Sequence, residues 1–282
     1  MNLIYPTVEN WVQSDQVSHV ARCARVCYAS EANNESSNFG LYKSLESKSH
    51  TSMFRHESRY YRICKKYIDN KLYKKLYNEL QKYKYCPYIH YHINDGNIYV
   101  ATNGDFVRNP LFNKLVGILN NFEISELGFD MNENIRKLIR HTFCITTQIS
   151  TSRELNRTSP NNIAEQSTRY VNFGKKKGIT ICLPHWWDES SWVKKILFKT
   201  YWKSCEIMYL LALKLGFKPE DARGVLPLDT ATKVVYTYNS LEWDNIIRLR
   251  YLGSTGRPHP NAKLVISQVA CKLKVEGYSD LY

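Results

Sequence analysis

An Asp-Gly pair sets the strongest constraint on the fold of this 282-residue chain. Asp95-Gly96 stands between two strand-like segments, Ile89 to Ile93 and Asn97 to Ala101. The two-residue turn that joins antiparallel strands needs positive φ angles, and Asp-Gly adopts them readily. The sequence therefore predicts a β-hairpin here, which commits this part of the chain to antiparallel pairing.

Most of the remaining chain carries helical or strand-like patterns. The longest predicted helix, Ser190 to Leu215, ends at Gly216, a good C-terminal cap. The residues expected to share one side of this helix are Trp192, Ile196, Tyr201, Cys205, Met208 and Leu215. We further predict helices over 14–28, 52–55, 67–83, 106–119, 152–157, 219–225, 241–251 and 260–275, strands over 59–63, 142–149 and 230–238, and a polar loop over 33–38. Because βαβ alternation is not regular, the pattern favours an α+β fold with a mixed or antiparallel sheet flanked by helices.

The chain is basic, with a formal net charge of +13. A lysine-rich soluble surface explains such a charge, and so does an anionic partner such as nucleic acid or a small phosphorylated ligand. The excess is spread from Lys65 to Lys274 and forms no single basic arm. A nucleic acid is therefore the less favoured partner.

Several classes of protein are disfavoured by simpler features. The longest apolar run, Ile207 to Leu213, is too short to cross a bilayer, and Met1 to Ser14 shows no secretion signal. The eight cysteines are scattered without a Cys-x-x-Cys, which argues against a zinc site and a disulfide framework. His90 and His92 share one face of a strand, but no nearby carboxylate or cysteine completes a metal site in the sequence. We expect a protein of the reducing cytoplasm with no membrane contact and no metal.

Polar and charged side chains gather between Ser152 and Phe173. Arg157 and Arg169 offer fork-shaped donors for a phosphate group. The residues that can read an amide or imide edge, or add a small hydroxyl, are Glu154, Glu165, Gln166 and Ser167. A solvated polar loop with salt bridges is the alternative explanation for such a cluster.

The same segment resembles the signature of flavin-dependent thymidylate synthases, in which Arg-His-Arg is followed after seven residues by Ser-x-Arg-Tyr. Arg157 holds the first position, and Ser167 to Tyr170 stand where the second part is expected. The run from Glu165 to Phe173 is especially close to one branch of that family, which has Gln-Glu-Ser-Thr-Arg-Tyr.

Three further matches follow in the order of the family. His50 to His56 resembles its His-x-Ser-x-x-Glu-His stretch, and Glu220 to Pro227 resembles its Ala-Arg-x-Val-Leu-Pro. The last match consists of Asn239, Asn245, Arg248 to Arg250 and Gly256 to Pro260. Residues from about 62 to 139 match weakly and look like the longer insert of the same branch. We therefore expect one domain over residues 1–282, with an inserted hairpin and helix region.

The chain departs from the family pattern at several positions. Thr158 and Ser159 replace the His and the second Arg of Arg-His-Arg, both of which help to hold FAD in the family. Glu165-Gln166 reverses the order found in the branch, Arg55 replaces a Glu, and Leu241 stands where Arg is usual. These changes suit a diverged enzyme, a changed substrate or a homologue that has lost its activity.

The resemblance implies a methyltransferase that converts dUMP to dTMP. Methylenetetrahydrofolate would supply the carbon unit and NADPH-reduced FAD the hydride, so no protein nucleophile is needed. Arg250 is the implied catalytic residue, because a fixed cation at the uracil edge stabilises negative charge that builds on the ring. The implied dUMP-binding residues are Glu154, Gln166, Ser167, Arg169, Arg223 and Arg250, and the implied FAD-binding residues are His50, Ser52, His56, Arg157, Glu165, Asn239 and Asn245. The resemblance also implies a homotetramer with active sites between subunits.

Two alternatives stay open. Hydroxymethylation of a pyrimidine nucleotide would keep the fold and change the product, and Glu165-Gln166 and Arg55 motivate it. A non-catalytic protein that has lost FAD and kept a basic nucleotide or nucleic-acid surface would account for Thr158 and Ser159.

Overall fold

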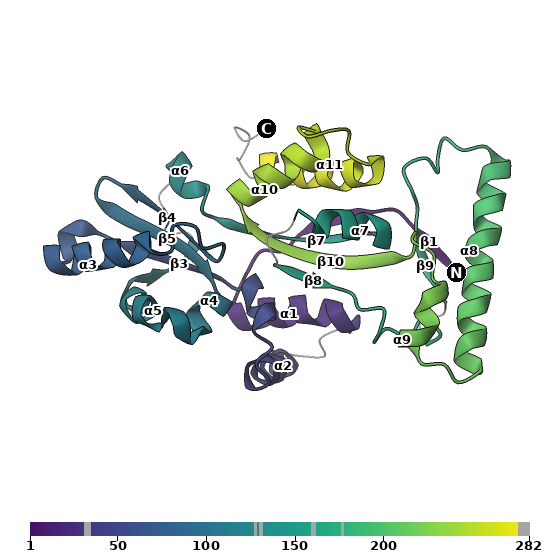
Figure 1. Ribbon diagram of the computed structural model, residues 1–282, viewed down its shortest axis with the longest axis horizontal. Coiled ribbons are helices and arrows are strands. Elements are labelled where there is room, and N and C mark those ends of the chain that lie inside the picture. The colour runs from purple at the N-terminus through teal and green to yellow at the C-terminus, as the bar shows by residue number, and fades with distance from the viewer. Residues whose placement is uncertain (31–34, 127–128, 130–131, 159–161, 176–177, 276–282) are drawn as a thin grey trace.

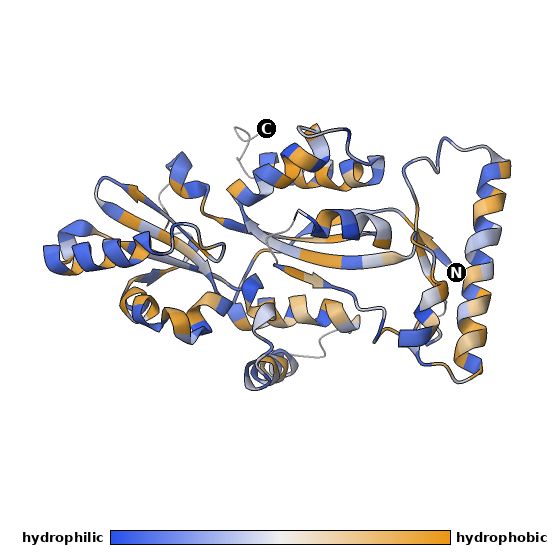
Figure 2. Cartoon of the chain, viewed as in Figure 1, coloured by the Kyte–Doolittle hydropathy of each residue, from blue (hydrophilic) through white to orange (hydrophobic). Residues whose placement is uncertain are grey.

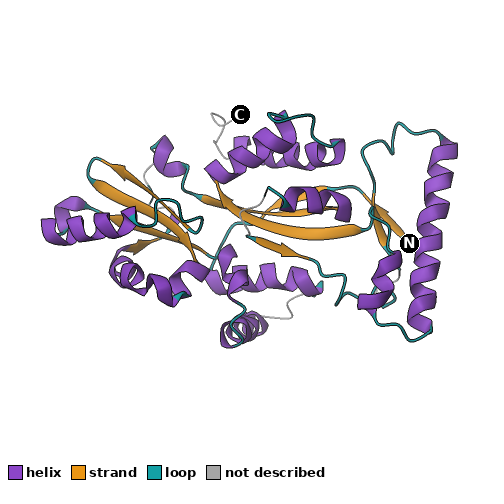
Figure 3. Ribbon diagram, in the orientation of Figure 1, coloured by secondary structure: helices purple, strands orange, loops and turns teal. Residues whose placement is uncertain are grey.

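A computed structural model of the chain describes residues 1–30, 35–126, 129, 132–158, 162–175 and 178–275 (Figure 1). Three parts follow one another along the long axis of the molecule. A four-stranded sheet with its helices lies at one end, a second four-stranded sheet lies in the middle, and a two-stranded sheet with a long helix lies at the other end (Figure 3). Helices and antiparallel sheets together make the fold α+β, as the sequence predicts.

The middle sheet is antiparallel throughout and has the order β2-β7-β10-β8. Its strands are β2 (Thr7–Asn10), β7 (Arg140–Gln148), β10 (Ala231–Asn239) and β8 (Ile163–Glu165). β7 and β10 pair over their whole length of nine residues. All of β7 is buried, and Lys233 is the exposed residue of β10. Such burial requires cover on both faces of the sheet.

Helices supply that cover (Figure 1). One face carries α7 (Ile149–Asn156), α10 (Ser240–Ile247), a π turn (Arg248–Leu252) and α11 (Pro260–Val275). The other face carries α1 (Gln16–Tyr28), with α2 (Glu35–Ser47) packed against it. Asp15 caps the start of α1: its side chain accepts a hydrogen bond from the Ser18 amide at 2.7 Å, and such caps favour a helix start.

The sheet at the first end has the order β4-β5-β3-β6 and its own apolar core. Its strands are β3 (Ser58–Ile63), β4 (Ile89–Asn94), β5 (Asn97–Asn103) and β6 (Glu123–Ile124). Its helices are α3 (Asn70–Gln81), α4 (Gly104–Arg108), α5 (Asn113–Leu119) and α6 (Glu133–Arg136). The predicted hairpin is confirmed: Asp95 and Gly96 have φ angles of 48° and 77°, which the tight turn between β4 and β5 requires.

The far end is built around one long helix. β1 (Asn2–Ile4) pairs in parallel with β9 (Thr180–Cys182), and α8 (Trp192–Lys214) and α9 (Pro219–Ala222) pack there. α8 buries Trp202 and Tyr209 in the local core. Apolar residues mark the whole length of α8 in Figure 2. Several of them are exposed: Trp192, Val193, Ile196, Leu197, Tyr201, Ile207, Met208 and Leu211.

Most predicted elements are confirmed, with shifts of a few residues at their ends. The polar loop predicted over 33–38 is wrong from residue 35 onward, where α2 begins, and residues 33 and 34 lie outside the described part. The single helix predicted over 106–119 is wrong because Pro110 breaks it: α4 ends at Arg108, a short 3₁₀ turn spans Pro110–Phe112, and α5 follows. Over the described residues, no helix combines the length and the apolar character needed to cross a membrane.

Candidate functional site

A polar pocket of about 700 Å³ lies where α7, β8 and β10 meet the segment 223–228. Its lining residues are Ile149, Arg153, Glu165, Gln166, Ser167, Thr168, Arg223, Gly224, Leu226, Pro227, Leu228 and Thr232. Four of them carry predicted binding roles: Glu165, Gln166, Ser167 and Arg223. The fold thus brings two of the sequence motifs, far apart along the chain, to one cavity.

The Glu165 carboxylate is held in the polar pocket by three side chains. Ser152 Oγ donates to Oε1 at 2.6 Å, Thr232 Oγ1 donates to Oε1 at 3.2 Å, and Asn156 Nδ2 donates to Oε2 at 3.1 Å. Asn156 is fixed in turn, because its Oδ1 accepts from the Tyr236 hydroxyl at 2.7 Å. Glu165 is therefore a positioned acceptor for a hydroxyl or N–H group of a ligand.

Backbone hydrogen bonds fix the loop that follows β8. The Gln166 amide donates to the Lys233 carbonyl at 2.8 Å, and the Ser167 amide donates to the Cys27 carbonyl at 2.9 Å. Ser167 Oγ accepts from the Arg169 amide at 3.2 Å. The loop is thus tied to both β10 and the end of α1.

Arg169 and Arg223 lie on neighbouring segments at this loop. Arg223 Nη1 donates to Thr168 Oγ1 at 3.2 Å, and Arg169 Nη2 lies 3.4 Å from Glu220 Oε2. Both arginines are exposed, so these contacts are weak and can be exchanged for an anionic ligand.

Arg250 lies elsewhere, on the π turn, and is paired with Glu154 of α7. Arg250 Nη1 is 3.4 Å from Glu154 Oε1, and Nη2 donates to the Glu154 carbonyl at 3.4 Å. Neither residue lines the polar pocket. Within one chain, the predicted dUMP-binding residues therefore form two groups: Gln166, Ser167, Arg169 and Arg223 in one, and Glu154 and Arg250 in the other.

Two of the predicted FAD-binding residues, His50 and Ser52, line a cavity of about 410 Å³ beside α1. We call it the α1 cavity, and its other lining residues are Ala24, Cys27, Tyr28, Leu45, Ser49, Thr51 and Met53. Cys27 connects it to the loop after β8, because its carbonyl accepts the Ser167 amide.

His56 occupies the core of the molecule. Its Nδ1 lies 2.8 Å from Thr237 Oγ1, which in turn lies 2.8 Å from Thr142 Oγ1. His19 Nε2 continues this buried chain of polar groups, 3.2 Å from Thr142 Oγ1. Burial lowers the pKa of His19 to about 4 and that of His56 to about 3, since a charged imidazole would lose its hydration there. His56 therefore stands in the structure as a neutral core histidine.

The remaining predicted FAD-binding residues line neither the polar pocket nor the α1 cavity. Arg157 is exposed at the end of α7, and Asn245 is exposed on α10. Asn239 is buried at the start of α10, where it forms a capping box with Glu242. The hydroxyl of Thr158 donates to the Leu155 carbonyl at 2.7 Å and so serves the end of α7, while Ser159 lies outside the described residues.

The positive charge of Arg55, which replaces the Glu of the family pattern, is paired with a carboxylate of the same chain. Its Nε lies 2.8 Å from Asp105 Oδ2, and its guanidinium carbon lies 5.0 Å from the centre of the Tyr88 ring. Asp105 belongs to α4, in the region that looks like an insert. Arg55 thus joins the stretch 51–56 to the neighbouring sheet.

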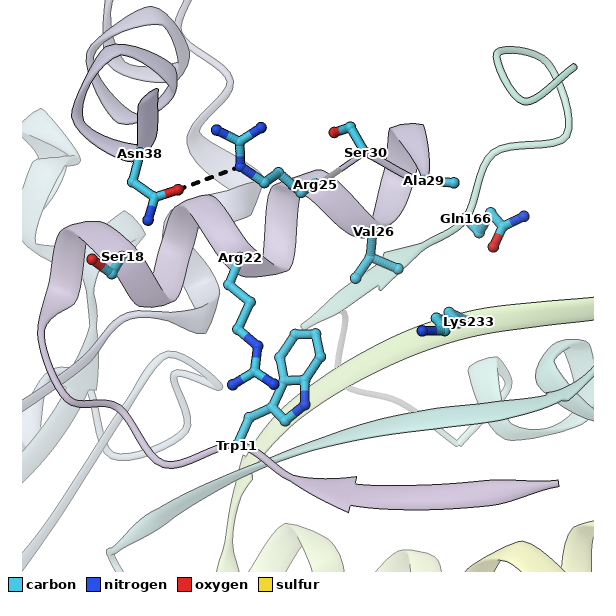
Figure 4. Close-up of a pocket in the computed structure, with 10 residues that line it drawn as sticks. All are labelled: Trp11, Ser18, Arg22, Arg25, Val26, Ala29, Ser30, Asn38, Gln166 and Lys233. Carbon is cyan, nitrogen blue, oxygen red and sulfur yellow. Dashed lines mark hydrogen bonds between the residues drawn. The ribbon is translucent and has the colours of Figure 1, made fainter. Parts of the chain in front are cut away.

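Another cavity, of about 510 Å³, lies beside α1, toward β10 and the loop after β8, and includes residues with no predicted role (Figure 4). We call it the basic pocket, and its lining residues include Trp11, Arg22, Arg25, Asn38, Gln166 and Lys233. Two signals in the sequence could have indicated it: Arg22 and Arg25 stand three residues apart on a helix, and Lys233 interrupts a buried strand.

Comparison with known proteins places this geometry in context. A family model described as thymidylate synthase complementing protein (Thy1) matches residues 124–274. No sequence among the curated proteins matches the chain. Two solved structures of the UMP/dUMP methylase PolB from Streptomyces cacaoi are similar. The structure with 5-Br dUMP is 18% identical, with a TM-score of 0.44, and covers 96% of this chain and 91% of that chain. The structure with 5-Br UMP is 16% identical, with a TM-score of 0.45, and covers 99% of this chain and 96% of that chain.

The matched residues contain the loop after β8, the segment 223–228, Glu154 and Arg250. The resemblance stated from the sequence is thereby confirmed at the level of the family. Since the match takes in more than half of the 282 residues, the chain belongs to the thymidylate synthase complementing protein (Thy1) family, the flavin-dependent thymidylate synthases.

Proposed function

We propose that this chain methylates dUMP to dTMP, with methylenetetrahydrofolate as the carbon donor and NADPH-reduced FAD as the source of hydride. The observation that carries the proposal is the polar pocket, where the signature loop meets Arg223 beside a fixed carboxylate. Its volume of about 700 Å³ lies within the ordinary range for small-ligand sites.

The nucleotide is held through its charged and polar groups. Arg169 and Arg223 supply two guanidinium groups for the phosphate, and Gln166 and Ser167 supply an amide and a hydroxyl beside them. Arg250 faces the uracil edge, where its positive charge stabilises the electron density that builds on the ring oxygens when the ring carbon attacks. Glu154 orients Arg250 through their ion pair.

The residues assigned to FAD have the chemistry to hold it. His50 and Ser52 offer an imidazole and a hydroxyl in the α1 cavity, and Arg157 offers an exposed guanidinium. Among the described residues, the buried Asn239 Nδ2 has no hydrogen-bond partner, so it retains a donor for a ligand. FAD, when bound, supplies the hydride; the chain binds, orients and excludes water.

A homotetramer is the assembly we propose. The outward side of α8 is apolar, although soluble helices are normally polar on the side that faces water. A second copy of the chain would cover it and would let the Glu154–Arg250 group of one subunit face the Arg169–Arg223 group of another. Light scattering coupled to size-exclusion chromatography measures the assembly, and a monomeric mass at micromolar concentration would contradict it.

The decisive experiment combines a visible spectrum with product analysis. Purified protein is expected to bind FAD, to show the flavin absorption bands, and to form dTMP from dUMP when the folate and NADPH are present. UMP serves as a second nucleotide in the same assay, and mass spectrometry identifies the product.

The two alternatives give different outcomes in this experiment. A hydroxymethylated product would be heavier than dTMP by one oxygen; Arg55 no longer favours it, because Asp105 balances that charge. A chain without flavin and without turnover, which still binds nucleotide or nucleic acid, would be the non-catalytic homologue.

A further inference from the structure

The basic pocket has the charge of an anion site. Arg22, Arg25 and Lys233 bring three cations to one cavity, and the described residues that line it include no carboxylate. A concave site lined by one sign of charge concentrates ligands of the opposite sign more strongly than a convex surface does. This cavity lies outside the residues to which the proposed reaction assigns a role, apart from Gln166.

Arg22 is held in place for binding. Its guanidinium carbon lies 3.7 Å from the centre of the Trp11 ring, and Figure 4 shows the two groups against each other. Such stacking fixes the plane of the guanidinium and leaves its edge donors available. Glu9 Oε2 lies 3.9 Å from Arg22 Nη2, but both side chains are about half exposed, so this pair is weak and an incoming anion can compete with it.

Arg25 builds the opposite wall of the basic pocket. It donates to the Ser37 hydroxyl at 2.7 Å and carbonyl at 3.1 Å, and to Asn38 Oδ1 at 3.4 Å, which fastens α1 to the start of α2. Figure 4 shows Arg25 pointing toward Asn38 and away from Trp11. Arg25 therefore adds charge, while Arg22 and Lys233 are the side chains that can donate directly to a ligand.

Gln166 joins the basic pocket to the polar pocket. Gln166 lines both cavities, and its backbone N–H donates to the backbone carbonyl of Lys233 at 2.8 Å. A ligand that reacts at the nucleotide can therefore extend past Gln166 and place a charged end between Arg22 and Lys233.

We propose that the basic pocket binds the compact polyanionic end of a second substrate, either a phosphate or a group of carboxylates, while the reacting end lies at the polar pocket. This inference rests on the proposed function. Two substrates of that reaction carry such an end: the ribose phosphate of NADPH and the glutamate tail of the folate.

Direct binding of inorganic pyrophosphate tests the anion site without turnover. Isothermal titration calorimetry compares the unaltered protein with Arg22→Gln and Lys233→Gln, and with Lys71→Gln as a control, since Lys71 is exposed on α3 and loses the same charge. We expect affinity about tenfold weaker in each pocket variant, as for loss of one charge-assisted hydrogen bond, and unchanged in the control. Equal affinity in all four proteins, or no binding at all, would overturn the proposal.

Steady-state kinetics then identify the source of the anion. The KM ratio of NADPH to NADH reports on the ribose phosphate, and the ratio of oligoglutamate to monoglutamate folate reports on the tail. We expect Arg22→Gln to move the KM ratio of the true ligand toward unity and to leave the other KM ratio unchanged. If neither KM ratio moves, the basic pocket binds neither the ribose phosphate nor the glutamate tail. If pyrophosphate binds in the basic pocket but no dTMP forms, the proposed function fails and the anion site stands.

Discussion

The guanidinium of Arg250 is largely withdrawn from water, with 20% of its side chain exposed, and it faces the Glu154 carboxylate at 3.4 Å. Among the described residues, its Nε has no hydrogen-bond partner. A partly desolvated cation with an unused donor binds a developing negative charge strongly, because little water has to be displaced when the charge forms.

Arg250→Ala is therefore expected to lower kcat for dTMP formation by about 10²–10³, the usual effect of removing one donor to a developing oxyanion. Flavin binding, read from the visible spectrum, should be unchanged. Arg248→Ala is the matched control: it lies two residues away, is exposed, and pairs with Asp244 at 2.7 Å on the helix surface. Full turnover in the Arg250 variant would remove this residue from the reaction.

Two core histidines make stability depend on pH. In the unfolded chain their pKa is near 6.5, while burial lowers the pKa of His19 to about 4 and that of His56 to about 3. At a pH below 6.5 but above the lowered pKa of each histidine, the unfolded state binds more protons than the native state. The free energy of unfolding therefore falls as the pH drops below 6.5. Above that pH both histidines are neutral in both states, and the effect disappears.

The expected slope is about 1.4 kcal/mol per pH unit for each histidine. Urea denaturation at about pH 7 and about pH 5 measures it. His19→Asn and His56→Asn should each reduce the slope, because each removes one buried imidazole whose pKa is lowered by burial. An undiminished slope in both core variants would assign the acid sensitivity to other groups.

At the scale of elements, the sequence predicts best where the local pattern and the tertiary contacts agree. The β4–β5 hairpin is specified by its turn, and β7 and β10 are specified by long runs of strand-forming residues. β1, β8 and β9 are missed because three residues carry no usable periodicity. α2 is missed because its first turn, Glu35-Ser-Ser-Asn38, is polar, and tertiary contacts hold it: Arg25 bonds to Ser37 and Asn38.

The same limit applies to the candidate site. Gln166, Ser167 and Arg223 are predicted together because the two motifs that contain them also form the wall of the polar pocket. The cap role of Asn239 is a local pattern, because Glu242 follows it by three residues, whereas the burial of His56 depends on how the sheets and helices pack. The basic pocket draws on α1, α2 and β10 together, so it becomes visible only in the fold.

Gly104 lies at a crowded position where α4 begins. A Cβ added there would overlap the buried Glu57 carboxylate and lie 2.7 Å from Arg108 Nη1. Arg59 and Arg108 both pair with Glu57, at 2.6 and 2.9 Å, so the carboxylate cannot move away without breaking an ion pair.

We expect Gly104→Ala to destabilise the protein by about 1–3 kcal/mol, as for overpacking of a tight core. Gly117→Ala in α5 is the control, because a Cβ there meets nothing within 4 Å and should stabilise by about 0.5–1 kcal/mol through helix propensity. Thermal or urea unfolding measures both variants. Equal stability in the two variants would mean that the Glu57 cluster is free to rearrange.

At the scale of the whole molecule, the two ends of the chain have different surfaces. The first end is a sheet with its own core and lysine-rich helix α3, whereas the far end presents an apolar side of α8. Leu197 is 65% exposed and Trp192 is 72% exposed on that helix, which is unfavourable for a free surface. Arg250 does not line the polar pocket of its own chain, and in the proposed homotetramer a second copy would bring it to Arg169 and Arg223.

A site shared between subunits can be detected by mixing inactive variants. Arg250→Ala damages one group and Arg169→Ala the other, so each homotetramer should be inactive. In tetramers reassembled from an equal mixture, about a quarter of the sites would receive an intact group from each of two subunits, and dTMP formation should return to that extent. Arg250→Ala mixed with Glu154→Ala is the control, since both changes lie in the same group and cannot complement each other. If the first mixture stays inactive although mass spectrometry shows mixed tetramers, each site is built from a single chain and the role of α8 must lie elsewhere.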